Sequence, residues 1–345
     1  MCSAFLWTGA PETAKDAKVS WASVCTPKKY GGLGLRRVEV WNRILCLRLI
    51  WLLFTKGGSL WVAWVKSNLL ADKSFWDLKT TSKGSWSWKK LLKLRSEART
   101  FSRCRLGNGS SCNFWLDSWL PQGPLIAELG ESGPRQYLLL IIHLLYDSSL
   151  LPFSTSRAWD LLHCFSSTDI APWHKSVWFT GSVPKHAFIS WLAVKKRLPT
   201  RDRLLSWGLN TPPDCLLCGS EIETTHHIFF GCDFSNEIWT SLLVSCPLSD
   251  CLASSLQEVL IWANRCSNDP TIRLMVKLLL QAAIYLIWRE RNTRLHDTQS
   301  KPADIILKDI LTTTRMRLSS FRGSNMDMNA HDSLLTIWFR HFECS

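Results

Sequence analysis

Apolar residues recur every three or four positions along much of the chain, which is the period of an amphipathic α-helix. The clearest example is residues 36–54, where one apolar face is predicted opposite a row of arginines. The predicted apolar face consists of Val38, Trp41, Leu45, Leu49 and Leu52, and the polar side carries Arg36, Arg37, Arg43 and Arg48. Other helices are predicted near 59–70, 86–98 and 156–166, after Cys232, and as two long helices within 255–295.

Helix boundary signals are most distinct between residues 184 and 208. Pro184 suits the first turn of a helix that is predicted to run to about Lys196. Thr200 suits the N-cap of a second helix, and Gly208 suits its end. A different signal occurs at Gly107, Asn108 and Gly109, a turn sequence between short apolar runs, which predicts a β-hairpin near residues 103–119.

Cys215, Cys218, His227 and Cys232 have the spacing of metal ligands, C-x2-C-x8-H-x4-C. Zn²⁺ favours four tetrahedral thiolate or imidazole ligands, and Gly219 suits the tight turn after the second thiol because it can adopt a positive φ. In a chain with 13 cysteines a C-x2-C pair arises readily by chance, so the appended H-x4-C makes the pattern specific. His226 is a competing ligand, although the spacing to Cys232 favours His227. Four protein ligands leave no position for water, which favours a structural site over a catalytic one.

These patterns predict a mainly α protein with a small zinc-knuckle subdomain and a short β-hairpin, arranged as a multi-part helical assembly. Four successive parts are expected: a helical segment with the hairpin at 1–125, a Pro-, Gly- and Ser-containing linker at 126–154, a zinc-binding domain at 155–245, and C-terminal helices at 250–345.

The formal net charge of +13 favours a polyanionic partner such as nucleic acid or an acidic membrane face. Cations are concentrated at residues 83–105 and 180–210. Such runs are often only solvated helix faces, but Trp86, Trp88 and Trp191 lie among these charges and are predicted to offer stacking surfaces for bases. The candidate phosphate contacts are Lys195, Lys196, Arg197, Arg201 and Arg203. Near the end of the last predicted helix, Arg289, Arg291 and Arg294 are expected to complement the helix C-terminus and to meet phosphates.

The odd number of cysteines, the metal-like spacing and the lack of a signal peptide pattern favour a reducing intracellular compartment. The apolar runs at 44–54, 138–145 and 278–288 are each shorter than the roughly 20 residues that a membrane-spanning helix needs. A soluble protein without membrane contact is therefore expected.

Four segments form a recognisable set: VPKHAFISWLA at 183–193, RLPTRDRLLSWG at 197–208, the Cys and His pattern at 215–232 and IWRERN at 287–292. Together they resemble the zinc-binding region that follows the polymerase in plant reverse transcriptases of LINE-type, non-LTR retrotransposons. Upstream, KKYGGLGLR at 28–36 and the stretch at 107–119 are similar to the post-polymerase segment of the same elements. The resemblance implies that the four motif residues bind zinc, that RNA or DNA is held through its phosphates, and that the protein is nuclear or cytoplasmic.

The polymerase carboxylates of those elements have no counterpart, because the chain contains no adjacent pair of aspartates. An enzyme that uses Cys218 as a nucleophile beside His226 or His227 is disfavoured because a metal uses the same residues better. The expected function is a noncatalytic, zinc-stabilised nucleic-acid-binding module, a C-terminal fragment of the retrotransposon protein. The alternative is an inert or scaffolding remnant that contacts only proteins, whose identity the residues do not indicate.

Overall fold

The computed structural model describes residues 2–8, 17–55, 58–71, 73–78, 84–101, 113, 115–118, 120, 122–130, 154–162, 167–244, 255–296, 300–321 and 333–342. Helices dominate these residues, and no strand occurs among them; their extended pairing is limited to an isolated bridge between Asp214 and Ile222. The prediction of a mainly helical protein is thus confirmed. Most of the predicted hairpin and most of the predicted linker lie outside the described residues.

The chain forms two compact units, one of residues 36–166 and one that joins residues 1–35 to residues 167–345. The described helices of the first unit are α3 (Val38–Phe54), α4 (Leu60–Val65), which continues into the wide turn η2 (Lys66–Leu70), α5 (Trp86–Lys93), α6 (Arg95–Phe101), α7 (Leu125–Leu129) and α9 (Thr155–Leu162). Its core gathers apolar side chains from α3, α4, α5 and α6.

Helix α3 occurs where the period predicted it, but it buries a different face. Ile44, Leu47, Ile50 and Leu53 are buried, whereas Val38, Leu45 and Leu49 of the predicted face are exposed. The predicted face was therefore wrong. Apolar residues surround almost the whole circumference of this helix, so more than one stripe satisfies the helical period, and only tertiary packing selects between them.

The basic segment predicted as one helix at 86–98 is two short helices, α5 and α6, separated at Leu94. Trp88 is buried in the core of the unit, so the prediction that it offers a stacking surface was wrong. Trp86 is exposed and lies beneath the Lys90 ammonium, 5.0 Å from the ring centroid. Arg95 is used internally, because its guanidinium donates hydrogen bonds to backbone carbonyls, including that of Trp76 at 3.1 Å.

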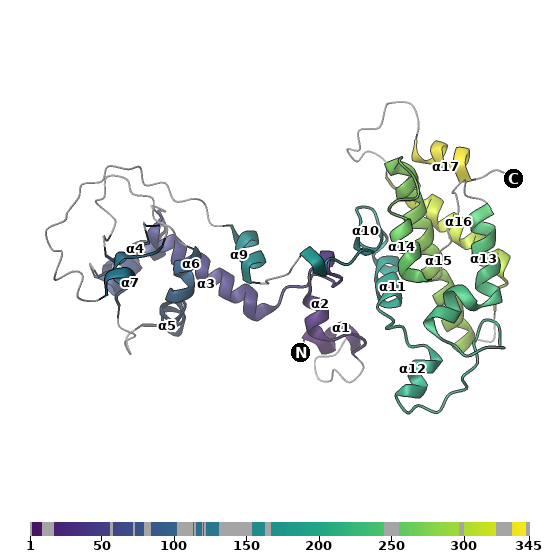
Figure 1. The fold of residues 1–345 in the computed structure, drawn as a ribbon, viewed down its shortest axis with the longest axis horizontal. Coiled ribbons are helices and arrows are strands. Elements are labelled where there is room, and N and C mark those ends of the chain that lie inside the picture. Colours follow the sequence, from purple (N-terminus) through teal and green to yellow (C-terminus); the bar gives the residue numbers. More distant parts are fainter. Residues whose placement is uncertain are drawn as a thin grey trace. The chain divides into compact units, whose positions relative to one another are not determined.

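The second unit contains the other described helices (Figure 1). They are α1 (Cys2–Thr8), α2 (Trp21–Cys25), η1 (Lys28–Tyr30), η3 (Ser167–Asp169), α10 (His174–Val177), α11 (Pro184–Val194), α12 (Arg201–Ser206), η4 (His227–Gly231), α13 (Asp233–Val244), α14 (Leu256–Trp262), α15 (Pro270–His296), α16 (Ala303–Ser319) and α17 (Leu334–Phe342). Pro184 is the first residue of α11, as predicted, and Gly208 follows α12 with a φ of 81°.

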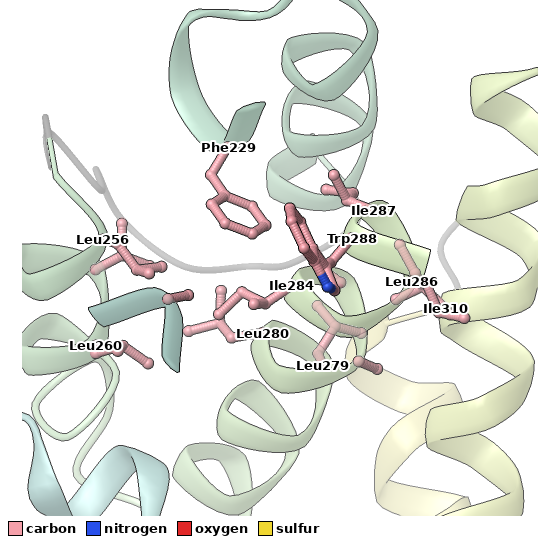
Figure 2. Packing of buried hydrophobic residues seen from close by; sticks show 14 of the residues in the cluster. Phe229, Leu256, Leu260, Leu279, Leu280, Ile284, Leu286, Ile287, Trp288 and Ile310 are labelled. Carbon is pink, nitrogen blue, oxygen red and sulfur yellow. The ribbon is translucent and has the colours of Figure 1, made fainter. Parts of the chain in front are cut away.

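Helix α15 is the centre of this unit, and α11 and α16 pack along it. Figure 2 shows Phe229, which comes from η4, beside Ile284 and Trp288 of α15. A side chain from the predicted zinc loop therefore enters the same core as the C-terminal helices. The sequence predicted residues 155–245 and 250–345 as successive domains. In the structure their described parts pack around one shared core, because the apolar surface of α15 is covered by side chains from both segments.

The N-terminal segment of this unit closes against α11. Trp191 is fully buried, and its indole N–H donates a hydrogen bond of 2.9 Å to the Gly31 carbonyl oxygen. Trp191 is thus a core residue, and the prediction that it offers a stacking surface was wrong. Gly32 allows the close approach of the chain, because a Cβ atom there would lie 1.9 Å from the Thr26 carbonyl oxygen.

By length and composition, α15 is apolar enough to cross a membrane, although the runs considered in the sequence were shorter. Of its most apolar window, 72% is buried inside the unit. Its hydrophobic surface is therefore already covered by protein, as in the core helix of a globular domain.

We predict a pH-dependent stability that arises from His186 of α11. Burial, reinforced by Lys185 and Arg289, lowers the pKa of His186 to about 4. In the unfolded chain the histidine protonates near pH 6.5, so below that pH the unfolded state binds a proton that the folded state still excludes. The free energy of unfolding is therefore highest above pH 6.5 and decreases as the pH falls towards 4. Between pH 7 and pH 5 the loss should be about 2 kcal/mol.

The measurement is the free energy of unfolding at both pH values for the wild type and for His186→Phe, which can still stack on Tyr285. Other titrating groups are common to both chains, so the difference between them isolates His186. Equal losses of stability in the two chains would contradict the prediction.

Candidate metal centre

The first two cysteines lie in a tight turn whose backbone closes on itself. The Cys215 N–H donates to the Glu221 carbonyl oxygen at 2.7 Å, and the Gly219 N–H donates to the Cys215 carbonyl oxygen at 2.8 Å. Gly219 has a φ of 72°, the left-handed conformation that the sequence predicted for it. This geometry directs the thiols of Cys215 and Cys218 towards the same point.

The second pair of residues comes from the wide helical turn η4. The Thr224 hydroxyl accepts a hydrogen bond from the His227 N–H at 3.0 Å, and the Cys232 N–H donates to the His227 carbonyl oxygen at 2.8 Å. This last bond spans the four residues between the two side chains and brings them to one side of the turn. His227 is buried, whereas the neighbouring His226 is exposed and its ring lies against Phe230.

The donor atoms of Cys215, Cys218, His227 and Cys232 all lie within 4.8 Å of one another. Within this group, Cys218 Sγ and His227 Nε2 lie 3.3 Å apart. Tetrahedral Zn²⁺, with bonds of about 2.3 Å to sulfur and about 2.0 Å to nitrogen, would separate its ligands by roughly 3.5–3.8 Å. The four residues therefore fit zinc with only small movements, and the matching His nitrogen is Nε2.

The surroundings of Cys215 and Cys218 favour the deprotonated form that a metal requires. The hydrogen bond from Cys232, aided by the backbone N–H groups of Cys218 and Leu217, lowers the pKa of Cys215 to about 5. The same interaction with Cys215 raises the pKa of Cys232, because the pair shares one proton. Burial opposes ionisation of Cys218, but N–H groups of Ser220 and Glu221 and the bond to His227 give a net lowering of its pKa.

The pKa of His227 is also affected by the neighbouring thiols. Burial lowers its pKa, but the hydrogen bond to Cys218 and the charge of Cys215 outweigh burial, so the net shift is upwards. Its second nitrogen, Nδ1, is buried 3.0 Å from Glu221 Oε2 but forms no hydrogen bond in this structure. The set of three sulfurs and one nitrogen leaves no open coordination position, which is typical of a structural site.

A buried ion pair fixes the turn of Cys215 and Cys218 against the long helix. Glu223 is fully buried, and its carboxylate accepts hydrogen bonds from the buried guanidinium of Arg291 in α15 at 3.1 and 3.2 Å. The same carboxylate accepts the N–H of Leu216 inside the turn at 3.3 Å and the N–H of Arg201 in α12 at 2.9 Å. One side chain thus joins the metal turn, α12 and α15.

The contacts of the three arginines near the end of α15 change what the sequence predicted for them. Arg291 was expected to meet phosphates, but it is buried against Glu223 and is not accessible to them. Arg294 donates to the carbonyl oxygen of Leu217, between the two cysteines, at 2.7 Å, and to Glu290 Oε1 at 2.9 Å. Arg289 is half-exposed, 3.6 Å from Asp309.

The structure places the five predicted phosphate contacts around the turn between α11 and α12. Lys196 and Arg197 are exposed. Lys195 is partly buried beside the Trp173 ring, Arg201 donates to the Asp214 carbonyl oxygen, and Arg203 donates to the carbonyl oxygen of Lys196 at 2.9 Å. Arg201 and Arg203 therefore also hold the loop structure, which the count of charges in the sequence did not reveal.

The sequence analysis also missed Glu223. Nothing nearby in the sequence distinguishes it from Glu221, and its partner Arg291 lies far along the chain, so spacing alone does not indicate the pair.

Comparison with known proteins agrees with this geometry. Residues 153–239 match the family described as zinc-binding in reverse transcriptase. The matched residues include all four candidate metal ligands. The chain is also 34% identical over 134 residues to an Arabidopsis thaliana protein named "Putative ribonuclease H protein". That alignment covers 38% of this chain and spans 21% of the length of the relative. No solved structure matches the chain.

We predict that the purified full chain retains one zinc ion and that His227→Ala loses it. His226→Ala is the matched control, because it removes the adjacent, exposed imidazole and should keep the metal. Metal content by mass spectrometry after dialysis measures the outcome, and Cys218→Ser should behave like His227→Ala. Loss of zinc in His226→Ala with retention in His227→Ala would reverse the choice of ligand.

We predict that breaking the buried ion pair is costly. Either Glu223→Gln or Arg291→Met should lower the free energy of unfolding by about 3–5 kcal/mol, because the remaining partner is left in the core without its counterpart. The double variant should recover part of this loss. Denaturant titration measures all three, with Lys308→Ala as the control, since its exposed pair with Asp304 should contribute less than about 1 kcal/mol. Losses in the single variants as small as in this control would refute the prediction.

Proposed function

We propose that the chain is a noncatalytic, zinc-stabilised nucleic-acid-binding module derived from the reverse transcriptase of a plant LINE-type, non-LTR retrotransposon. The observation that carries the proposal is the closed set of three cysteines and one histidine, which lies within the matched zinc-binding region and directly beside a basic turn. In this proposal zinc supports the fold and takes no part in a reaction. RNA or DNA is the partner, and the site of action is the nucleus or the cytoplasm.

The charge of the second unit supports a phosphate-binding role for the turn between α11 and α12. No described carboxylate forms an ion pair with Lys195, Lys196 or Arg197. Cations that lack such partners within the protein attract a polyanion and release its counterions when it binds. The plant relative is named as a ribonuclease H protein, which also agrees with a nucleic-acid context.

A scaffolding remnant is the second candidate, and it is favoured by the exposed apolar side chains of the first unit. Leu60 is 89% exposed, and Trp64 and Val38 are also exposed. Exposed apolar surface of this kind is typical of protein contacts. Full-length, zinc-loaded protein that binds neither RNA nor DNA at low salt would favour this candidate over the first.

We predict that the full chain binds RNA and DNA oligonucleotides without sequence preference and with an affinity that falls steeply as salt increases. A triple variant, Lys195→Gln with Lys196→Gln and Arg197→Gln, should bind more weakly. Its plot of log affinity against log salt should be shallower by about 0.7 for each phosphate of a single strand that the variant no longer neutralises.

The matched control removes the same charge elsewhere, with Lys66→Gln, Lys308→Gln and Arg340→Gln. Fluorescence anisotropy across a series of salt concentrations measures both variants. If the two variants weaken binding equally, net charge alone is responsible, and the assignment to the turn is rejected.

A further inference from the structure

Trp207 differs from the tryptophans that form the two cores because 52% of it is exposed. It follows the last residue of α12, and Gly208, with its positive φ, turns the chain away immediately after it. The neighbouring residues Leu205 and Leu209 are also exposed. A large, flat indole is therefore presented to solvent at the end of a helix, close in sequence to the basic turn.

A guanidinium group stabilises the position of this indole. The Arg203 guanidinium lies over the Trp207 ring, 4.9 Å from its centroid. The same guanidinium donates to the carbonyl oxygens of Lys196 and Leu198 at 2.9 and 3.4 Å. Arg203 thus connects the ring to the turn between α11 and α12. In that turn Lys196 adopts a φ of 53°, which is uncommon for a residue with a side chain.

One cation from a distant part of the chain adds to this charge. Burial, followed by the positive charge of Arg203, lowers the pKa of Lys18 in the N-terminal segment. Burial and Arg197 lower the pKa of Arg203, and burial and Arg197 likewise lower the pKa of Lys195.

Among the described residues, no carboxylate is in ion-pair distance of these cations. Asp202 is near Arg203, but its carboxylate accepts a hydrogen bond from the Thr200 hydroxyl. The cluster therefore holds mutually repelling charges that an external anion would relieve.

We propose that Trp207 stacks on a base of single-stranded nucleic acid whose phosphates lie along Lys196 and Arg197. This inference rests on the proposed function and adds to it the strandedness of the partner and the residue that contacts a base. An aromatic ring beside a basic groove binds single strands without sequence preference, because every base has a face that can stack. In a duplex those faces are covered by neighbouring bases, so a duplex contacts the cations but not the ring.

The test compares three fluorescently labelled ligands on the full, zinc-loaded chain: an unstructured pyrimidine 20-mer as DNA or RNA, an abasic strand of the same length, and a duplex. Trp207→Ala should weaken binding of the unstructured strand about tenfold, as expected when one stacked base is released. It should leave the affinities for the abasic strand and the duplex nearly unchanged. Trp207→Phe, which keeps a stacking face, should restore most of the affinity.

The matched control is Trp64→Ala, which removes another half-exposed tryptophan from the first unit and should have no effect. Circular dichroism and zinc content confirm that each variant is folded. If Trp207→Ala weakens all three ligands equally, or weakens none, the stacking role is overturned while the proposed function stands. If the wild-type chain binds no ligand at low salt, the proposed function fails, and the stacking role fails with it.

Discussion

The charge pair of Glu223 and Arg291 is the interaction on which the arrangement of the second unit depends. Removing two charges from water is costly, so both must remain paired and hydrogen-bonded once the core closes around them. The carboxylate also accepts the N–H groups of Leu216 and Arg201. The segments that it joins cannot move independently, and the turn that carries two of the metal ligands is therefore held by α15 even before a metal contributes.

Cationic side chains around the metal centre serve two purposes. Arg201, Arg291 and Arg294 act inwards, where their planar groups satisfy backbone carbonyls or the buried carboxylate. Lys196 and Arg197 face solvent. The high net charge of the chain thus overstates the charge available to a partner, since part of it holds loops of the protein itself.

Local patterns were predictable and long-range ones were not. The metal ligands lie within 18 residues, so their spacing carries most of the geometry, and Gly219 has the backbone conformation expected of it. The buried face of α3 was mispredicted because the helix is apolar on nearly every side. Trp88 and Trp191 are buried although cations flank them in sequence, because side chains on neighbouring positions of a helix point in different directions. Glu223 and Arg291, 68 residues apart, have no local signature.

The contact between Gly31 and Trp191 makes the second unit discontinuous, because residues 36–166 lie between its two parts in the chain. Such a long insertion adds little to the cost of closure, since each doubling of loop length costs only about 0.6 kcal/mol. Its consequence lies in the order of synthesis on the ribosome. Residues 1–35 leave the ribosome well before α11, their packing partner, is synthesised. They cannot be buried in their core until the whole inserted unit has been made.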